Sequence, residues 1–80
     1  MPVDVFLPTL GDMEEGTLLE WLTPAGARVE TGQPIAVVDA DKVTVDVHAP
    51  GTGYLTILLE AGERAVVQQL IARIDPEPPQ

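Results

Sequence analysis

The close spacing of turn-forming residues constrains this chain more than any other feature. Seven glycines and eight prolines recur so often that no segment offers ten residues of clean helical periodicity between two breakers. The stretches between them are short and apolar, and several alternate with period two, as strands do. They are residues 3–7, 17–22, 28–29, 34–39, 43–47, 54–59, 65–67 and 70–74. The sequence therefore predicts an all-β protein.

The second half of the chain repeats the first. Shifted by 36 positions, residues 17–39 lie on residues 53–75 with at least eight identities in 23 positions, where roughly one or two are expected by chance. The first strands match at a shift of 40, which aligns two alternating apolar triplets: Val3, Val5 and Leu7 with Val43, Val45 and Val47. The first half thus has about four extra residues, which we expect in the loop 9–16.

Each half of the repeat holds about four short strands joined by glycine turns. Neither half can bury its apolar face alone, so we expect the two halves to face one another in a sandwich or flattened barrel with internal pseudo-two-fold symmetry. This symmetry predicts that the turn around residues 39–43 lies at one end of the molecule and both chain termini near the other.

Length and charge narrow the classes of function. Eighty residues suit one small domain that buries roughly 60% of the surface of its unfolded chain, which leaves little room for an internal active site. A net charge of −9 argues against partners such as nucleic acid or anionic membranes. There is no cysteine, signal-peptide pattern or long apolar run, so we expect a soluble protein. The prolines of residues 76–80 indicate the start of an interdomain linker, which makes residues 1–75 the domain.

Lys42 is the only lysine of the chain, and it lies in a turn between two apolar runs, residues 34–39 and 43–47. The neighbouring carboxylates of Asp39 and Asp41 favour an ammonium ion, which is not a nucleophile. We therefore interpret Lys42 as an exposed amine that another enzyme can acylate, and not as a catalytic residue.

No other group of residues indicates catalysis or metal binding. Asp12, Glu14 and Glu15 do not have the spacing of a calcium loop. His48 is the only histidine, and the chain has no cysteine to share a metal ion with it. No threonine lies in a recognisable catalytic triad. We expect no catalytic residue and no metal site, and so no enzyme activity from the isolated domain.

Two segments resemble the lipoyl domains of 2-oxo acid dehydrogenase acyltransferases, which belong to the biotin/lipoyl-attachment family. Residues 7–17, Leu-Pro-Thr-Leu-Gly-Asp-Met-Glu-Glu-Gly-Thr, are similar to the opening of those domains, and Asp41-Lys42-Val43 is similar to their lipoylated turn. Weaker matches extend the resemblance over residues 3–74: Trp21, Leu22, Gly26, Val29, Gly32, Ala49, Pro50, Gly53 and residues 60–62. The chain departs from the family pattern at Asp39-Ala40, where Glu-Thr is usual, and at His48, where acidic residues are common.

The resemblance implies a flattened β-barrel of two four-stranded antiparallel sheets, with Lys42 at the tip of a β-turn between Asp41 and Val43. A lipoyl ligase or transferase would join lipoate to the Lys42 amine as an amide. The lipoyl arm would carry acyl groups from a thiamine-dependent 2-oxo acid decarboxylase to the acyltransferase core of the same chain and coenzyme A, and dihydrolipoyl dehydrogenase would reoxidise it. Such a domain is expected to be a monomer in the cytoplasm of a bacterium, or in the mitochondrial matrix of a eukaryote.

The resemblance also assigns a role to the loop 9–16. In the family this loop lies near the lysine turn and helps the decarboxylase to recognise its own carrier. Asp12, Glu14 and Glu15 are therefore candidates for partner recognition, and the alternative is that they only solvate the loop.

Two other functions stay open at this point. A biotinyl carrier domain has a closely similar fold but has Met on both sides of its lysine, where this chain has Asp41 and Val43. An unmodified β-barrel that serves only for docking would leave Lys42 without a cofactor. The sequence also leaves open whether the acyl group comes from pyruvate, acetoin, 2-oxoglutarate or a branched-chain 2-oxo acid.

Overall fold

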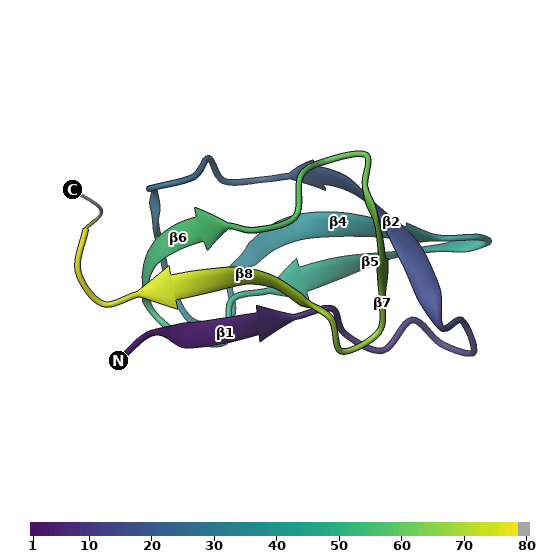
Figure 1. Ribbon diagram of the computed structural model, residues 1–80, viewed down its shortest axis with the longest axis horizontal. Coiled ribbons are helices and arrows are strands. Elements are labelled where there is room, and N and C mark those ends of the chain that lie inside the picture. Colours follow the sequence, from purple (N-terminus) through teal and green to yellow (C-terminus); the bar gives the residue numbers. More distant parts are fainter. Residues whose placement is uncertain (79–80) are drawn as a thin grey trace.

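The computed structural model describes residues 1–78 and shows eight strands with no helix among them (Figure 1). The strands are β1 (Val3–Phe6), β2 (Glu15–Trp21), β3 (Arg28–Val29), β4 (Pro34–Ala40), β5 (Val43–His48), β6 (Gly53–Ile57), β7 (Arg64–Val66) and β8 (Leu70–Asp75). All eight predicted strands are present, and their ends differ from the predicted ones by at most two residues. With no helix in the described part of the chain, there is none that could span a membrane.

The strands form two antiparallel four-stranded sheets, with the orders β1-β8-β6-β3 and β5-β4-β2-β7. This confirms the predicted fold class. Strands β1, β2, β3 and β4 of the first half correspond to β5, β6, β7 and β8 of the second. Replacing each strand by its counterpart turns the order of one sheet into that of the other, as a two-fold axis requires. The prediction that the halves face one another was wrong in one respect, because each sheet takes two strands from each half. The first and third strands of each half pair only with strands of the other half, so the two halves interleave.

The strand register corrects the shift of 40 that we expected for the first strands. Val5 lies opposite Ala72 in one sheet, and Val47 lies opposite Ala36 in the other. Since Ala36 and Ala72 are equivalent at a shift of 36, Val5 is equivalent to Val47, at a shift of 42. The error of two residues has a physical cause: in a strand, a shift by two keeps every side chain on the same face, so alternation alone cannot exclude it.

A bulge in β2 adds one residue to the first half that has no counterpart in the second half. The register slips between Leu18 and Glu20, so that Leu18 lies opposite Val38, as Leu55 lies opposite Ile74. Leu18 is therefore the counterpart of Leu55, while the bulged Leu19 is 47% exposed. It follows that the loop between β1 and β2 is five residues longer than its counterpart between β5 and β6, and not four as expected.

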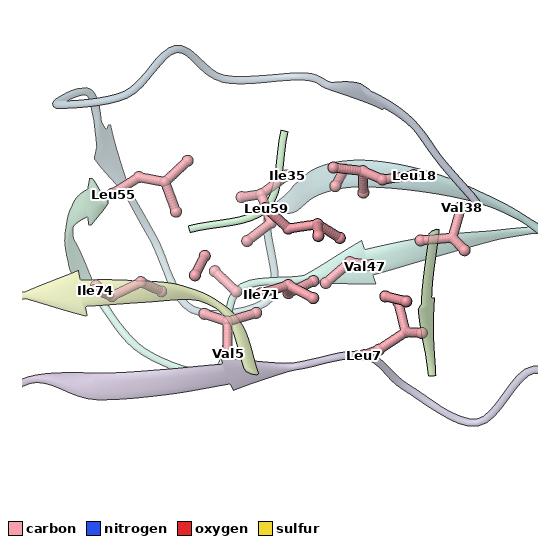
Figure 2. Packing of buried hydrophobic residues seen from close by; sticks show 14 of the residues in the cluster. Val5, Leu7, Leu18, Ile35, Val38, Val47, Leu55, Leu59, Ile71 and Ile74 are labelled. Atoms are coloured by element: carbon pink, nitrogen blue, oxygen red, sulfur yellow. The ribbon is translucent and has the colours of Figure 1, made fainter. Parts of the chain in front are cut away.

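The core lies between the two sheets and contains only apolar side chains (Figure 2). Among the described residues, 17 hydrophobic side chains are buried and no polar or charged residue is. In β4 the buried and less buried positions alternate through Ala36, Val38 and Ala40, which shows one face of the sheet turned to the core. Burial of apolar surface from both sheets at once is what ties the interleaved halves together.

The ends of the molecule are arranged as the repeat predicted. The hairpin of β4 and β5 projects at one end of the long axis, and the N-terminus and the end of β8 lie at the other (Figure 1). The principal extents are 37 × 19 × 17 Å, so the hairpin tip is far from the N-terminus and from the end of β8. The expected linker, residues 76–80, lies partly outside the described residues, and the boundary at residue 75 stays a prediction.

One buried hydroxyl supplies a test of the packing. The Oγ1 atom of Thr23 is buried without a hydrogen-bond partner, and symmetry matches Thr23 with the buried Leu59. We expect Thr23→Val to raise the free energy of unfolding by about 1 kcal/mol, because a methyl group of nearly the same volume replaces the buried hydroxyl that has no hydrogen-bond partner. The matched control is Thr56→Val, which loses a hydrogen bond to Asp75 Oδ2 of 3.1 Å and is expected to destabilise. Urea denaturation of both variants measures the difference, and a destabilised Thr23→Val contradicts the argument.

Two equivalent glycines mark close approaches between strands. A Cβ atom on Gly16 would lie 2.8 Å from the Asp39 carbonyl oxygen and 3.1 Å from Leu10 Cδ1, and one on Gly53 would meet the equivalent Asp75 carbonyl. We expect Gly16→Ala to lower the free energy of unfolding by about 2 kcal/mol, because the backbone of β4 must move away. In Gly51→Ala the new Cβ would meet only the side chain of Val3, so a clearly smaller loss is expected. Equal losses in urea denaturation would show that the approach to β4 is not tight.

Candidate functional site

Lys42 lies at the tip of the β4–β5 hairpin, in a two-residue turn. Ala40 and Val43 are the last paired residues, which leaves Asp41 and Lys42 as the loop. The φ angle of Asp41 is 64°, in the left-handed region that Asp tolerates better than most residues. The local sequence thus explains the sharp turn, with a short polar residue at the strained position and the lysine beside it.

The hairpin holds Lys42 out into solvent. Ala40 is 2% exposed, but the next four residues are all exposed, and Val43 is 50% exposed. Strand β5 is the outer strand of its sheet, and of its six residues only Val47 is buried. Strand β4 thus stays in the core up to Ala40 and exposure begins at the turn itself, so the amine is reachable by another protein.

Lys42 is the one lysine or arginine side chain that makes no ion pair within residues 1–78. The three arginines form the described ion pairs, in which Arg28 meets Glu30, Arg64 meets Glu15 and Arg73 meets Asp4. No hydrogen bond from the Lys42 amine is present in that part of the chain either. The amine is thus free of protein contacts that an incoming acyl group would have to break.

The loop between β1 and β2 packs beside the lysine turn. Met13 N donates a hydrogen bond of 3.2 Å to the Leu10 carbonyl oxygen, which closes a turn at Gly11 with a φ angle of 66°. Leu10 is completely buried and fixes this turn to the core. Between the loop and the hairpin lies an open hollow of about 320 Å³. It is lined by Leu10, Gly11, Asp12, Met13, Ala40, Asp41, Lys42 and Val43.

The three acidic candidates for recognition do not form one cluster. Asp12 lines the hollow beside Lys42. Glu15 forms an ion pair with Arg64, and both line a second hollow of about 300 Å³, which shares Met13 and Asp41 with the first. The Glu14 side chain lines neither hollow, although its carbonyl oxygen accepts a 2.9 Å hydrogen bond from Val67 N. Within residues 1–78, no three acidic or histidine side chains meet in an arrangement that could hold a metal ion.

Sequence reasoning missed the apolar neighbours of Lys42. Leu10 and Met13 line the hollow, but in the loop 9–16 only the acidic residues were expected to take part in recognition. Gly16 was missed as well, although its contact with β4 brings the loop against the hairpin. The available signal was weak: the only hint was a pair of apolar residues inside an otherwise acidic loop.

Comparison with known proteins agrees with this geometry. The profile of a biotin/lipoyl family, described as biotin-requiring enzyme, matches residues 3–74. The pyruvate dehydrogenase E1 component subunit beta of Rhizobium meliloti is 41% identical over 68 residues, which are 82% of this chain and 15% of that protein. The dihydrolipoyllysine-residue acetyltransferase component of the pyruvate dehydrogenase complex of the same organism is 40% identical over 75 residues, 90% of this chain and 17% of that protein.

Two further proteins extend the comparison. The dihydrolipoyllysine-residue succinyltransferase component of the 2-oxoglutarate dehydrogenase complex of Cupriavidus necator is 35% identical over 77 residues, 94% of this chain and 18% of that protein. The solution structure of the lipoyl domain of the 2-oxoglutarate dehydrogenase complex from Azotobacter vinelandii has a TM-score of 0.68. That alignment covers 89% of this chain and 95% of the other at 20% identity, and it shows the shared fold.

The chain spans less than a fifth of the length of these curated relatives, so it corresponds to one module within them. The family profile covers almost the whole chain, and the strand arrangement matches that of a lipoyl domain. The chain belongs to the biotin/lipoyl-attachment family, as a domain of the lipoyl type found in 2-oxo acid dehydrogenase acyltransferases.

Proposed function

We propose that this domain is a lipoyl carrier whose lipoyl group is amide-linked to Lys42. The observation that carries the proposal is the position of Lys42, the only lysine of the chain, at an exposed hairpin tip opposite the N-terminus and the end of β8. A group attached there can reach other active sites while the domain stays tethered at its other end. When bound, the dithiolane of lipoate supplies acyl transfer coupled to two-electron reduction.

The residues of this chain suit that group. The amine makes no contact that acylation would break, and conversion to an amide removes a positive charge beside the acidic Asp41 and Asp12. Asp41 holds the left-handed turn that keeps the amine at the tip, and Val43 begins the returning strand. The protein therefore positions the attachment point and the recognition surface, and it adds no acid, base or nucleophile of its own.

Biotin is the alternative cofactor that the family profile admits. The neighbours of the lysine argue for lipoate, because biotinyl domains have Met on both sides where this chain has Asp41 and Val43. The names of the curated relatives, which include dihydrolipoyllysine-residue acyltransferases, also favour lipoate.

The proposed partners rest on these names together with the resemblance to lipoyl domains. We infer a thiamine-dependent 2-oxo acid decarboxylase as the acyl donor, an acyltransferase core as the acceptor site, dihydrolipoyl dehydrogenase as the oxidant and a lipoyl ligase as the modifying enzyme. Relatives occur in pyruvate and 2-oxoglutarate dehydrogenase complexes, and one of them is a dehydrogenase β subunit, so the parent is either an acyltransferase or its dehydrogenase partner. We place the carrier in the cytoplasm, as a monomeric domain.

Intact mass spectrometry tests the attachment. We expect the domain, treated with a lipoyl ligase, ATP and lipoate, to gain the mass of one lipoyl group, and Lys42→Arg to gain none because no other lysine is present. Arg keeps the positive charge at the tip, so the variant should fold with the same urea midpoint. A biotinyl mass would favour the alternative cofactor, and an unmodified Lys42 would favour a pure docking module.

Recognition by the decarboxylase is tested through the charges of the loop. We expect Asp12→Asn with Glu14→Gln to lower the rate of reductive acylation by about tenfold, which corresponds to a loss of about 1.4 kcal/mol of binding free energy. Lipoylation should stay unchanged. The charge-matched control is Glu60→Gln with Glu63→Gln, in the exposed turn between β6 and β7. Equal acylation rates in both double variants would mean that the loop charges only solvate it.

Replacing residues 9–15 by two residues, the length of the symmetric loop, removes the loop itself. We expect this variant to be lipoylated but poorly acylated, because the hairpin tip remains while the surface beside it is lost. The lipoylation rate and the acylation rate are measured on the same preparation, so a misfolded variant would be recognised by the loss of both.

A further inference from the structure

The hollow beside Lys42 is mostly apolar, although the carboxylates Asp12 and Asp41 are among its lining residues. Its accessible apolar surface comes from Met13 of the loop and Val43 of the hairpin, because Leu10 and Ala40, which also line it, are only 0% and 2% exposed. Met13 is 40% and Val43 50% exposed, so both present carbon atoms to solvent on either side of the lysine. Together they form a small apolar surface beside the lysine, and burying it against an apolar group is favourable.

We propose that this hollow is a resting site for the apolar part of the arm on Lys42, its hydrocarbon chain and dithiolane ring. The inference rests on the proposed lipoylation and goes beyond it. The arm alternates between a state folded against Met13 and Val43 and an extended state that reaches the partner enzymes.

The tether favours this occupant over others. Lys42 itself lines the hollow, so a group attached to its amine begins at the rim. A short flexible tether gives an effective concentration in the millimolar range, and weak apolar contacts then suffice to hold the arm for part of the time. No partner protein has that advantage.

Size and charge agree with the same occupant. The hollow of about 320 Å³ is at the lower end of the range for small-molecule sites, about 300–1,000 Å³. Asp12 and Asp41 line it and repel an anion. Lipoate loses its carboxylate charge when it forms the amide, so the bound arm is neutral and can enter the hollow.

The first test is structural and uses the whole domain with three groups on Lys42: lipoyl, octanoyl and acetyl. All three remove the same charge, but only the first two carry a long apolar arm. We expect nuclear Overhauser contacts from the lipoyl ring protons to the methyl groups of Met13 and Val43. Amide shifts at residues 10–13 should change with the two long arms and not with acetyl. If lipoyl and acetyl give the same spectrum of the loop, the arm does not rest there and the proposal fails.

The second test measures how far the hollow protects the lipoyl ring from reduction by a reagent in solution. We expect Met13→Gln with Val43→Thr to speed reduction of the lipoyl ring by a water-soluble phosphine by about two- to fivefold, because the reactive extended state gains population. The control pairs Leu19→Gln with Val66→Thr, since Leu19 is 47% and Val66 50% exposed and neither lines the hollow. The control should react at the rate of the parent domain. Equal rates in parent and in Met13→Gln with Val43→Thr would overturn the proposal.

Failure of this inference can be separated from failure of the proposed function. If no ligase modifies Lys42, the arm can still be attached with an activated ester of lipoate, with the site confirmed by mass after digestion. Both tests then apply unchanged. Ring contacts that grow with protein concentration would place the arm on a second molecule and would also contradict the resting site.

Discussion

The structure depends on the pairing of strands between the two halves of the repeat. Strands β1, β3, β5 and β7 pair only with partners from the opposite half, so neither half has a complete sheet by itself. Backbone groups left without such partners would lose their hydrogen bonds, and the apolar face beneath would be exposed to water. A single cooperative core follows, with side chains from both sheets packed into it (Figure 2).

Much of this fold could be predicted from the sequence, because glycine and proline turns and an internal repeat are both visible in the residues themselves. The turn residues separated the strands, and the repeat indicated both the symmetry and the position of the lysine turn opposite the termini. The register of the first strands could not be predicted, because alternation with period two permits shifts of 40 and 42 equally. The bulge at Leu19 was hidden for a related reason: two adjacent leucines fit either phase of the strand, and only the partner strand decides which one is buried.

In the site, the unique lysine could be predicted from the sequence, but the roles of its common acidic and apolar neighbours could not. Lys42 stands out as the only lysine of the chain, and the structure places it at an exposed tip. Asp12, Glu14 and Glu15 are adjacent in sequence, but a turn and the start of β2 send them to different surfaces. The contribution of Met13 depends on how the loop lies on the hairpin, which is set by the close approach of Gly16 to β4. A three-dimensional contact of that kind leaves no periodic mark in the sequence.

Departures from symmetry are concentrated at the end that carries Lys42. The five extra residues of the first half lie in the loop beside the hairpin, while the shorter counterpart lies at the end of the termini, where Gly51 approaches Val3. By the same equivalences, the lysine turn between β4 and β5 corresponds to the position between the end of β8 and the start of β1, which no turn connects. A fully symmetric barrel would have the same structure at both ends of its long axis. In this chain the β4–β5 turn and the lengthened loop occur at one end only. Leu10 ties the added loop to the core, while Asp12 and the partly exposed Met13 of the same loop line the hollow beside Lys42, so the asymmetry of the chain lies at the lysine turn.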